Sequence, residues 1–493
     1  PWRARQLAGR GGMRTPGLAG ARPALHACRA PKLRLLRSGG QCVAAHRPAG
    51  PHSTPAPAPA ATHPPPSPPS PSFGTEHEKL GYYLAAPHAR LSYDTIEALL
   101  TSLCARFGWD PVTEAGRIIG ATHTDGDGLQ SVSLEPGGQL ELSGAPLDTL
   151  HKTCAEAHSH LYQVKTCAAD LGVAFLGLGF DPKWAVADVP RMPKDRYRIM
   201  RDYMPRVGGL GLDMMFRSCT IQVNLDFESE ADMVAKFRAS LALQPVATAL
   251  FANSPFRDGA DTGFKSWRSH VWTDTDGDRC GVPHFVFEPG FSFERYVDYA
   301  LDVPMYFVSR GGAYLDATQQ RVTFRDFLDG NNPVAPGQRP TLKDWETHLT
   351  TLFPEVRLKR YLEMRGADGG PWSEICALPA LWVGLLYDAE SLASALDLVA
   401  DWTAADHDAL RAGVPRGALA TPFRGGTVGD VAKKVVALSA AGLARRGRDE
   451  ARFVAPLVKI AESGVTPADA LVAKFHGQWK QSVEPVYSPG FTY

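Results

Sequence analysis

The chain has 493 residues, of which 44% are hydrophobic, and it carries 52 Lys and Arg against 52 Asp and Glu. This hydrophobic fraction is sufficient for a large buried core and excludes a wholly disordered protein. The neutral total hides an uneven distribution, because residues 1–72 contain ten basic and no acidic side chains. The rest is therefore acidic and offers no basic surface for nucleic acid. No apolar run reaches the roughly 20 residues that a membrane helix needs.

Residues 1–72 differ in kind from the rest of the chain. They are rich in Arg, Ala, Pro and Ser, lack acidic residues, and end in a proline-rich stretch over Pro55–Pro71. This composition is typical of an organelle transit peptide followed by a linker, and an ordinary disordered tail is the alternative. We therefore expect a disordered transit peptide and Pro-rich linker over residues 1–72, and a globular body over residues 73–493.

The body is predicted to mix helices and strands without a regular βαβ alternation. In chain order, the first half of the body is predicted to contain a helix at Leu91–Phe107 with Ser92 as N-cap, two strands within Ser131–Ser143, a helix at Leu147–Leu171 and strands at Val173–Gly179 and Thr220–Phe227. A helix at Glu230–Ala252 follows, and Pro245 is expected to interrupt it. The rest is predicted to contain a short strand at Tyr361–Arg365 and helices at 388–401, 428–445 and 449–463. This irregular order favours an α+β fold over a doubly wound one.

Several common sites are missing. No G-x-x-x-x-G-K-[ST] motif is present, so the chain has no Walker-type phosphate loop. None of the eight cysteines forms a C-x-x-C pair, and no His/Cys group has zinc spacing. Six scattered cysteines in a body of this size suggest a reducing compartment, with one long-range redox pair left open.

Pairs of carboxylates lie in segments that read as strands. Glu76 and Glu78 are two residues apart, which places both on one face of a strand. Glu135, Gln139 and Glu141 share the same parity around a double glycine. Neighbouring carboxylates repel unless a cation lies between them, and oxygen ligands suit Mg²⁺. The alternative for such a pair is an ordinary solvated strand face.

Polar and basic residues complete the pattern. Thr220, Gln222 and Asn224 alternate with apolar residues, which suggests a sheet face that lines a pocket, although simple hydrogen bonding on an exposed face remains an alternative. Glu363 and Arg365 also share a face, where structural ion pairing is the alternative. Arginine binds phosphate and carboxylate bidentately. Acidic residues for Mg²⁺ and arginine clamps without a phosphate loop suit an ATP-dependent enzyme that phosphorylates a carboxylate.

Six motifs resemble the plant-type glutamate–cysteine ligase family, and the similarity runs from Phe73 almost to the end of the sequence. They are Gly74–Lys79, Ser133–Ser143, Met214–Phe227, Ala242–Phe256, Tyr296–Tyr306 and Phe353–Leu386. The resemblance implies a curved, mostly antiparallel sheet with surrounding helices, related to glutamine synthetase, in a single catalytic domain over residues 73–493. It also implies a chloroplast location in the stroma and the first step of glutathione biosynthesis, in which ATP, L-glutamate and L-cysteine give γ-glutamylcysteine, ADP and phosphate through γ-glutamyl phosphate.

The resemblance also assigns roles to individual residues. The Mg²⁺ and ATP ligands it implies are Glu76, Glu78, Glu135 and Glu363, with Gln139, Glu141, Gln222 and Asn224 as companions. Arg365 resembles the arginine that faces the transferred phosphate. Arg268 and Thr220 are expected near glutamate, and Tyr299 and Trp372 as walls of the amino-acid pockets.

Cys154 and Cys376 match a cysteine pair of the plant branch, which implies a redox-controlled disulfide and a redox-dependent homodimer. One departure from the family is the proline-rich sequence before Phe73, because proline donates no ladder hydrogen bond and the strand that carries Glu76 is then expected to be truncated. Two other functions remain as alternatives. One is a sibling carboxylate–amine ligase with another amino acceptor, and the other is an inactive, redox-sensing homologue.

Overall fold

An antiparallel sheet forms the centre of the computed structural model, which describes residues 71–488 and 491–493. Its strands follow the order β14-β15-β7-β1-β5-β4-β3-β2, and β6 also pairs with β1. Their bounds are β1 Phe73–Tyr83, β2 Asp110–Glu114, β3 Arg117–Asp125, β4 Gly128–Leu134, β5 Leu140–Ser143, β6 Val173–Leu176, β7 Thr220–Leu225, β14 Val356–Leu358 and β15 Leu362–Asp368. The expected transit peptide, residues 1–70 of it, lies outside the described residues.

The register of the sheet separates a polar face from an apolar one. In β1, Glu76 pairs with Gln222 of β7 on one side and with Ser143 of β5 on the other, and Glu78 pairs with Glu141. Since side chains alternate along a strand, these polar residues share one face. The opposite face carries residues such as Val223 and joins the hydrophobic core. The sheet therefore has one face for packing and one for chemistry.

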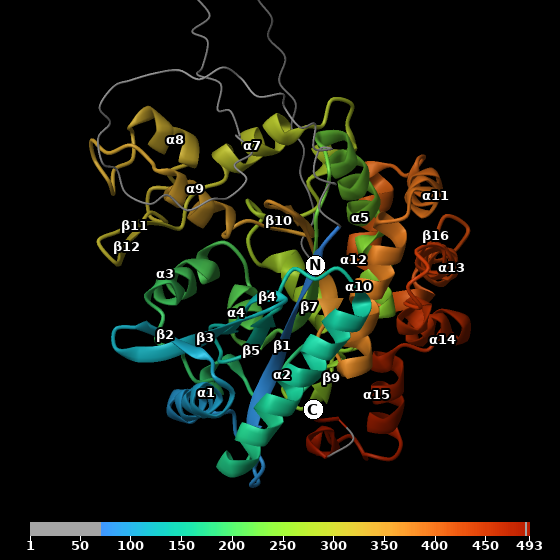
Figure 1. The fold of residues 1–493 in the computed structure, drawn as a ribbon, viewed down its shortest axis with the longest axis horizontal. Helices are drawn as coiled ribbons and strands as arrows, with labels where there is room; N and C mark the ends of the chain where they lie inside the picture. The colour runs from blue at the N-terminus through green and yellow to red at the C-terminus, as the bar shows by residue number, and fades with distance from the viewer. Residues whose placement is uncertain (1–70, 489–490) are drawn as a thin grey trace, which may run out of the picture. The chain divides into compact units, whose positions relative to one another are not determined.

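Helices cover the apolar face in two groups. α1 (Tyr93–Phe107) and α2 (Leu150–Leu171) pack over β3, β4, β5 and β6 around one core cluster. α5 (Glu230–Leu250) and α10 (Trp372–Leu386) pack over β7 and β15 around a larger one, which also takes in α13 (Val428–Arg445). In Figure 1, α2 crosses β1, and the orange α13 lies farther from the sheet than α10.

Shorter helices and loops surround the polar face and fill the rest of the body. The remaining α-helices are α3 Asp195–Tyr203, α4 Gly211–Arg217, α6 Trp267–Val271, α7 Phe293–Asp302, α8 Phe324–Asp329, α9 Leu342–Leu349, α11 Ala389–Val399, α12 Ala404–Gly417, α14 Ala455–Ser463 and α15 Pro467–His476. Within the described ranges, no single helix is long and apolar enough to cross a membrane; only α10 and α11 together reach that length and composition, and they meet at 88°.

The predicted elements are largely confirmed, with corrections at two of them. Ser92 caps α1 as predicted, accepting a hydrogen bond from the backbone N–H of Thr95. α5 is continuous through Pro245, whereas an interruption was predicted, because burial on all sides from Leu241 to Leu250 outweighs the one helical hydrogen bond that proline removes. The strand after α2 ends at Leu176 rather than Gly179. β1 begins at Phe73, directly after the proline-rich segment, and pairs with β7 from that residue onward, so the strand segment that carries Glu76 is formed.

Candidate active site

A cavity of about 300 Å³ lies on the polar face of the sheet. Its floor is formed by β1, β5, β7 and β15, and its walls come from α3, α4, α6 and the loops around residues 272 and 351. Eight predicted site residues line it together: Glu76, Glu78, Glu135, Gln139, Glu141, Thr220, Gln222 and Arg268, with Arg365 from β15 as a ninth. Asn224 and Glu363 lie at its edge, bonded to these residues.

One side of the cavity is acidic. Glu76 accepts a 2.8 Å hydrogen bond from Asn224, and Glu78 accepts a 3.0 Å bond from the backbone N–H of Thr220. Burial, together with the charges of Glu363 and Glu141, raises the pKa of Glu76 to about 7. Burial and the neighbouring carboxylates likewise raise the pKa of Glu78 well above its usual value. These carboxylates are crowded and short of positive charge.

This crowding fits a divalent cation shared with a ligand. No group of three or more His, Cys, Asp or Glu between residues 71 and 488 is arranged as a ready-made metal cage. Mg²⁺ seldom uses such a cage, because it binds through one or two carboxylates plus substrate phosphates and keeps several waters. Burial and the neighbouring carboxylates raise the pKa values of Glu76 and Glu78, and a cation bound among these groups would favour their charged forms. The donor set therefore fits Mg²⁺ bound together with a nucleotide.

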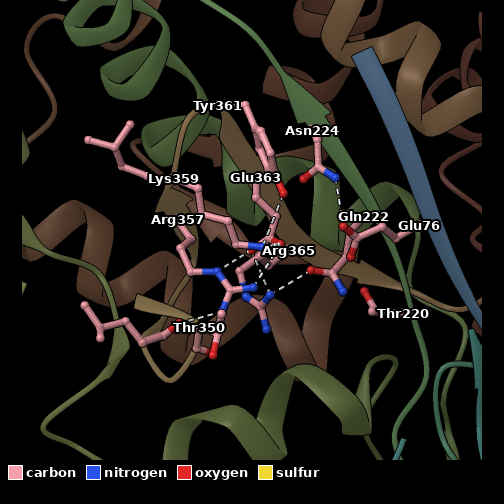
Figure 2. A network of polar contacts seen from close by, with 12 residues as sticks. Glu76, Thr220, Gln222, Asn224, Thr350, Arg357, Lys359, Tyr361, Glu363 and Arg365 are labelled. Atoms are coloured by element: carbon pink, nitrogen blue, oxygen red, sulfur yellow. Dashed lines mark hydrogen bonds and ion pairs between the residues drawn. The ribbon is translucent and has the colours of Figure 1, made fainter. Parts of the chain in front are cut away.

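The other side of the cavity is basic and is organised by Glu363. Figure 2 shows three cationic side chains converging on this fully buried carboxylate. Arg357 donates to it from Nε at 2.6 Å and from Nη2 at 2.9 Å. Lys359 and Arg365 donate to it at 3.0 and 2.9 Å. Burial alone would raise the pKa of Glu363, but these three positive charges hold that pKa well below its usual range. Glu363 is therefore an anchor that gathers positive charge.

The two predicted anion clamps are connected. The Arg365 guanidinium also donates a 2.7 Å hydrogen bond to the side-chain oxygen of Gln222. Arg268 is 3% exposed and donates from Nη2 to the backbone oxygen of Arg365 at 2.9 Å. Arg268 and Arg365 therefore face the same cavity from α6 and β15. A ligand with two anionic groups is suited to span them.

Two predicted site residues, Gln139 and Thr220, are held in the cavity wall by hydrogen bonds to the backbone. The Gln139 side chain accepts from the Gly137 N–H at 2.9 Å and donates to the Ser218 oxygen at 2.9 Å. A Cβ at Gly137 would lie 2.3 Å from the backbone oxygen of Phe216, so this turn requires glycine. The Thr220 hydroxyl donates to the Ala367 oxygen at 2.7 Å. Both residues shape the cavity wall through contacts with the backbone.

Tyr299 and Trp372, the two predicted walls of the amino-acid pockets, do not line the cavity. Tyr299 lies on α7 with its ring 5.2 Å from that of Phe285, where apolar packing explains its position. Trp372 begins α10, is 45% exposed, and has its ring 6.3 Å from that of His158. The family resemblance implied a place for both of them at the amino-acid pockets, but in the structure α7 and α10 direct their side chains elsewhere.

Sequence reasoning missed several cavity residues. Arg357 and Lys359 alternate with apolar residues before Tyr361, and this strand parity was a usable signal for their shared face with Glu363. Arg196 and Tyr197 come from α3, whose mixed charge gave no signal. Arg196 stands out because its one side-chain hydrogen bond in the described structure is a 3.4 Å contact with the Tyr197 hydroxyl. It is available for an anionic ligand.

A disulfide joins Cys154 of α2 to Cys376 of α10, with their Cα atoms 5.6 Å apart and a sequence separation of 222. This is the pair that the family resemblance implied. It connects the two helix groups that cover the apolar face of the sheet, on the side opposite the cavity.

Comparison with known proteins now identifies the fold and then the family. The structure superposes on the glutamate–cysteine ligase of Francisella tularensis, solved in complex with AMP, with a TM-score of 0.52 and 13% sequence identity over 86% of this chain and 89% of that one. The two share a glutamine synthetase-like α+β fold. The model of Glutamate-cysteine ligase family 2 (GCS2) matches residues 72–489, and the chain belongs to this family.

Plant glutamate–cysteine ligases are similar in sequence to this chain over most of their length. The chain is 59% identical over 414 residues to the chloroplastic glutamate–cysteine ligase of Solanum lycopersicum, covering 84% of this chain and 78% of the relative. It is 60% identical to that of Brassica juncea, covering 84% and 79%. It is also 59% identical to that of Arabidopsis thaliana, covering 84% and 78%.

Proposed function

We propose that this protein is a glutamate–cysteine ligase, which joins the γ-carboxylate of L-glutamate to the amine of L-cysteine with ATP and releases γ-glutamylcysteine, ADP and phosphate. The observation that carries the proposal is the division of the cavity into an acidic side at Glu76 and Glu78 and a basic side at Arg365. Residues 73–493 are the catalytic domain, and the product is the first intermediate of glutathione synthesis.

The reaction has two steps, and each needs charge control. The glutamate γ-carboxylate attacks the terminal phosphorus of ATP, which forms an acyl phosphate and releases ADP. The cysteine amine then attacks the acyl carbon, and phosphate leaves as the amide bond forms. In the first step two anions must approach each other, so the chain has to neutralise negative charge at the point of transfer.

The basic side is suited to that task. Arg365 is fixed by Glu363 and Gln222, which leaves the rest of its guanidinium for the transferred phosphoryl group. Arg357 and Lys359 add charge on the same side. Because the guanidinium is already held in place before the reaction, it need not reorganise as charge develops. We assign Arg365 as the catalytic residue that faces the phosphoryl group.

The acidic side would hold Mg²⁺ and, through it, ATP. The residues proposed to hold Mg²⁺ are Glu76, Glu78, Glu135 and Glu141, with Glu363, Gln139, Gln222 and Asn224 as outer contacts to metal or nucleotide. When bound, Mg²⁺ supplies neutralising charge between the phosphates and these carboxylates. A site for an anionic nucleotide can be lined by several carboxylates if Mg²⁺ is bound with the nucleotide, because the cation offsets the negative charge of both.

Arg268 is proposed to hold glutamate. It lines the cavity beside Arg365 and can accept a carboxylate bidentately. Thr220, the first residue of β7, lines the same cavity and keeps that edge of the pocket in shape. Glutamate carries one carboxylate for binding and one for reaction, which matches two arginines in one cavity.

Location and regulation follow the same proposal. The relatives named above are chloroplastic, and residues 1–72 have the composition of a plastid transit peptide, so we place the protein in the stroma. The Cys154–Cys376 disulfide would respond to thiol status and shift the protein between monomer and homodimer. No nucleic-acid or membrane partner is proposed.

The test is phosphate release by the full chain with Mg²⁺, ATP, glutamate and cysteine. We expect release to require all four, and γ-glutamylcysteine to match phosphate in amount. Release with another amine in place of cysteine would favour the sibling ligase. No turnover combined with a thiol-dependent change of oligomeric state would favour an inactive sensor. Import of a fluorescent fusion to residues 1–72 into isolated chloroplasts tests the location.

A further inference from the structure

A buried carboxylate at the end of β15 has no place in the reaction described above. Asp368 is 0% exposed and does not line the cavity. It reaches the polar face of the sheet through a β-bulge, since Met364 pairs with Val223 but the next pair is Ala367 with Ile221. Two residues of β15, Arg365 and Gly366, therefore oppose one residue of β7.

The bulge reverses the alternation of side chains. Before the bulge, Glu363 and Arg365 lie on the polar face of the sheet and Met364 joins the core. After the bulge, Ala367 joins the core and Asp368 lies on the polar face. A regular strand would turn Asp368 into the hydrophobic core. The bulge packs closely against α5 at Gly366, where a Cβ would lie 2.3 Å from the Gln244 amide nitrogen and 2.8 Å from the Thr248 hydroxyl. The Thr248 hydroxyl fixes it further by donating to the Gly366 oxygen at 3.0 Å.

Asp368 accepts hydrogen bonds from two serine side chains. Ser254 donates to one carboxylate oxygen at 2.7 Å, and Ser266 donates to the other at 2.8 Å. The backbone N–H of Asn253 adds a bond of 2.8 Å. A serine hydroxyl has one proton, so each serine that donates to Asp368 can only accept from its other neighbours.

These serines in turn hold the first turn of α6. The Ser254 hydroxyl accepts from the backbone N–H of Arg268 at 3.1 Å, and the Ser266 hydroxyl accepts from that of Ser269 at 3.0 Å. α6 has only five residues and cannot hold its shape by its own hydrogen bonds. The carboxylate thus sets the hydroxyl directions that fix the helix, and the helix carries Arg268.

We propose that Asp368 is a positioning residue, which acts through Ser254 and Ser266 to aim the Arg268 guanidinium at the carboxylate of glutamate. The inference rests on the proposed function in that it takes glutamate as the ligand of Arg268. It adds that the affinity for this substrate is set from outside the cavity, by a carboxylate that touches neither substrate nor nucleotide.

The test is Asp368→Asn in the full chain. The asparagine amide has the size of the carboxylate, but it presents an NH₂ group to one of the two serines. The hydroxyl of that serine then has no oxygen of residue 368 to which it can donate. We expect the KM for glutamate to rise about 10- to 100-fold, the KM for ATP to change less than twofold, and glutamate binding measured by calorimetry to weaken by the same factor as KM. Ser254→Ala and Ser266→Ala should each show a smaller effect in the same direction, and they decide the question if Asp368→Asn does not fold.

Glu450→Gln is the matched control. Glu450 is equally buried and accepts from the backbone N–H of Leu150 at the start of α2, far from α6 in sequence. It should lower stability without a selective effect on glutamate. Equal rises in both KM values, or an unchanged glutamate KM in the aspartate and serine variants, would overturn the inference. If the unaltered protein neither binds nor turns over glutamate, the proposed function fails instead.

Discussion

The guanidinium of Arg365 and the carboxylate of Glu363 lie 2.9 Å apart on one face of β15, two residues apart in sequence. The same carboxylate also binds Arg357 and Lys359, so one buried negative charge holds three positive ones at the edge of the cavity. Like charges at this spacing repel without a central anion. Glu363 therefore maintains a concentration of positive charge that the cavity presents to its ligand.

Replacing Arg365 by lysine should lower kcat about 100- to 1,000-fold, because an ammonium cannot hold Glu363, Gln222 and a phosphoryl group together. The measurement is steady-state phosphate release, with circular dichroism to verify folding. Arg360→Lys is the matched control, since Arg360 lies five residues away and its side chain is 89% exposed. A kcat within twofold of the unaltered protein would remove Arg365 from the catalytic role.

Replacing Glu76 by glutamine should stabilise the metal-free protein at pH 8. The pKa of Glu76 is raised to about 7, so the folded state binds a proton more tightly than the unfolded state and its stability falls as pH rises from about 4.5 to 7. Removing the charge should recover about 2 kcal/mol of unfolding free energy, measured by urea denaturation in EDTA.

The same variant should respond less to Mg²⁺. In the unaltered protein, Mg²⁺ with a non-hydrolysable ATP analogue should raise the melting temperature, because the cation binds the folded state only. Glu294→Gln, an exposed glutamate on α7, serves as control and should leave both effects intact. Equal responses to Mg²⁺ in all three proteins would place the metal elsewhere.

Strand parity explains why so much of the site followed from sequence. The face of β7 was predictable because this strand alternates strictly, which placed Gln222 and Asn224 together. In β1, the two-residue spacing of Glu76 and Glu78 was enough to place both on one face. The bulge in β15 was not predictable, because it involves close packing of Gly366 against Gln244, which lies 122 positions earlier in the sequence.

Residues on short helices were the least predictable part of the site. Arg196 reaches the cavity from α3, and its direction is set by the packing of α3 against β12 (Ala313–Asp316) and α4 rather than by a sequence period. Tyr299 and Trp372 lie outside the cavity, since α7 and α10 carry their rings into other surroundings. A motif indicates which segments meet but not the rotation of every helix within them.

Glu374 should make stability depend on pH away from the site. It is 5% exposed on α10, one of its oxygens has no hydrogen-bond partner, and burial raises its pKa to about 8. The folded state therefore prefers the protonated form, and its contribution falls by about 1.4 kcal/mol per pH unit as pH rises from about 5 to 8. Glu374→Gln should become more stable than the unaltered protein as pH increases.

Urea denaturation at pH 6 and pH 8.5 provides the measurement for Glu374. We expect the stability difference between the variant and the unaltered protein to grow by roughly 3 kcal/mol between these values, reduced by any relaxation around the ionised group. Glu390→Gln is a suitable control, because its side chain is 73% exposed. A difference that does not change with pH would show that Glu374 is ionised at both.

The Cys154–Cys376 disulfide should contribute stability through the loop it closes. It spans 222 residues, and closing so long a loop restricts the unfolded chain strongly, so we expect reduction to cost about 2–4 kcal/mol. Cys154→Ser should have the lower stability with or without reductant, whereas the unaltered protein should fall to that level only after reduction. Cys104→Ser, which removes a free cysteine of α1, is the control and should retain the response to reductant. The measurement is chemical denaturation of all three proteins with and without dithiothreitol. Size-exclusion chromatography of the same samples separates this stability effect from the proposed change between monomer and dimer. Identical denaturation midpoints for the oxidised and reduced unaltered protein would contradict a stabilising role for the bond.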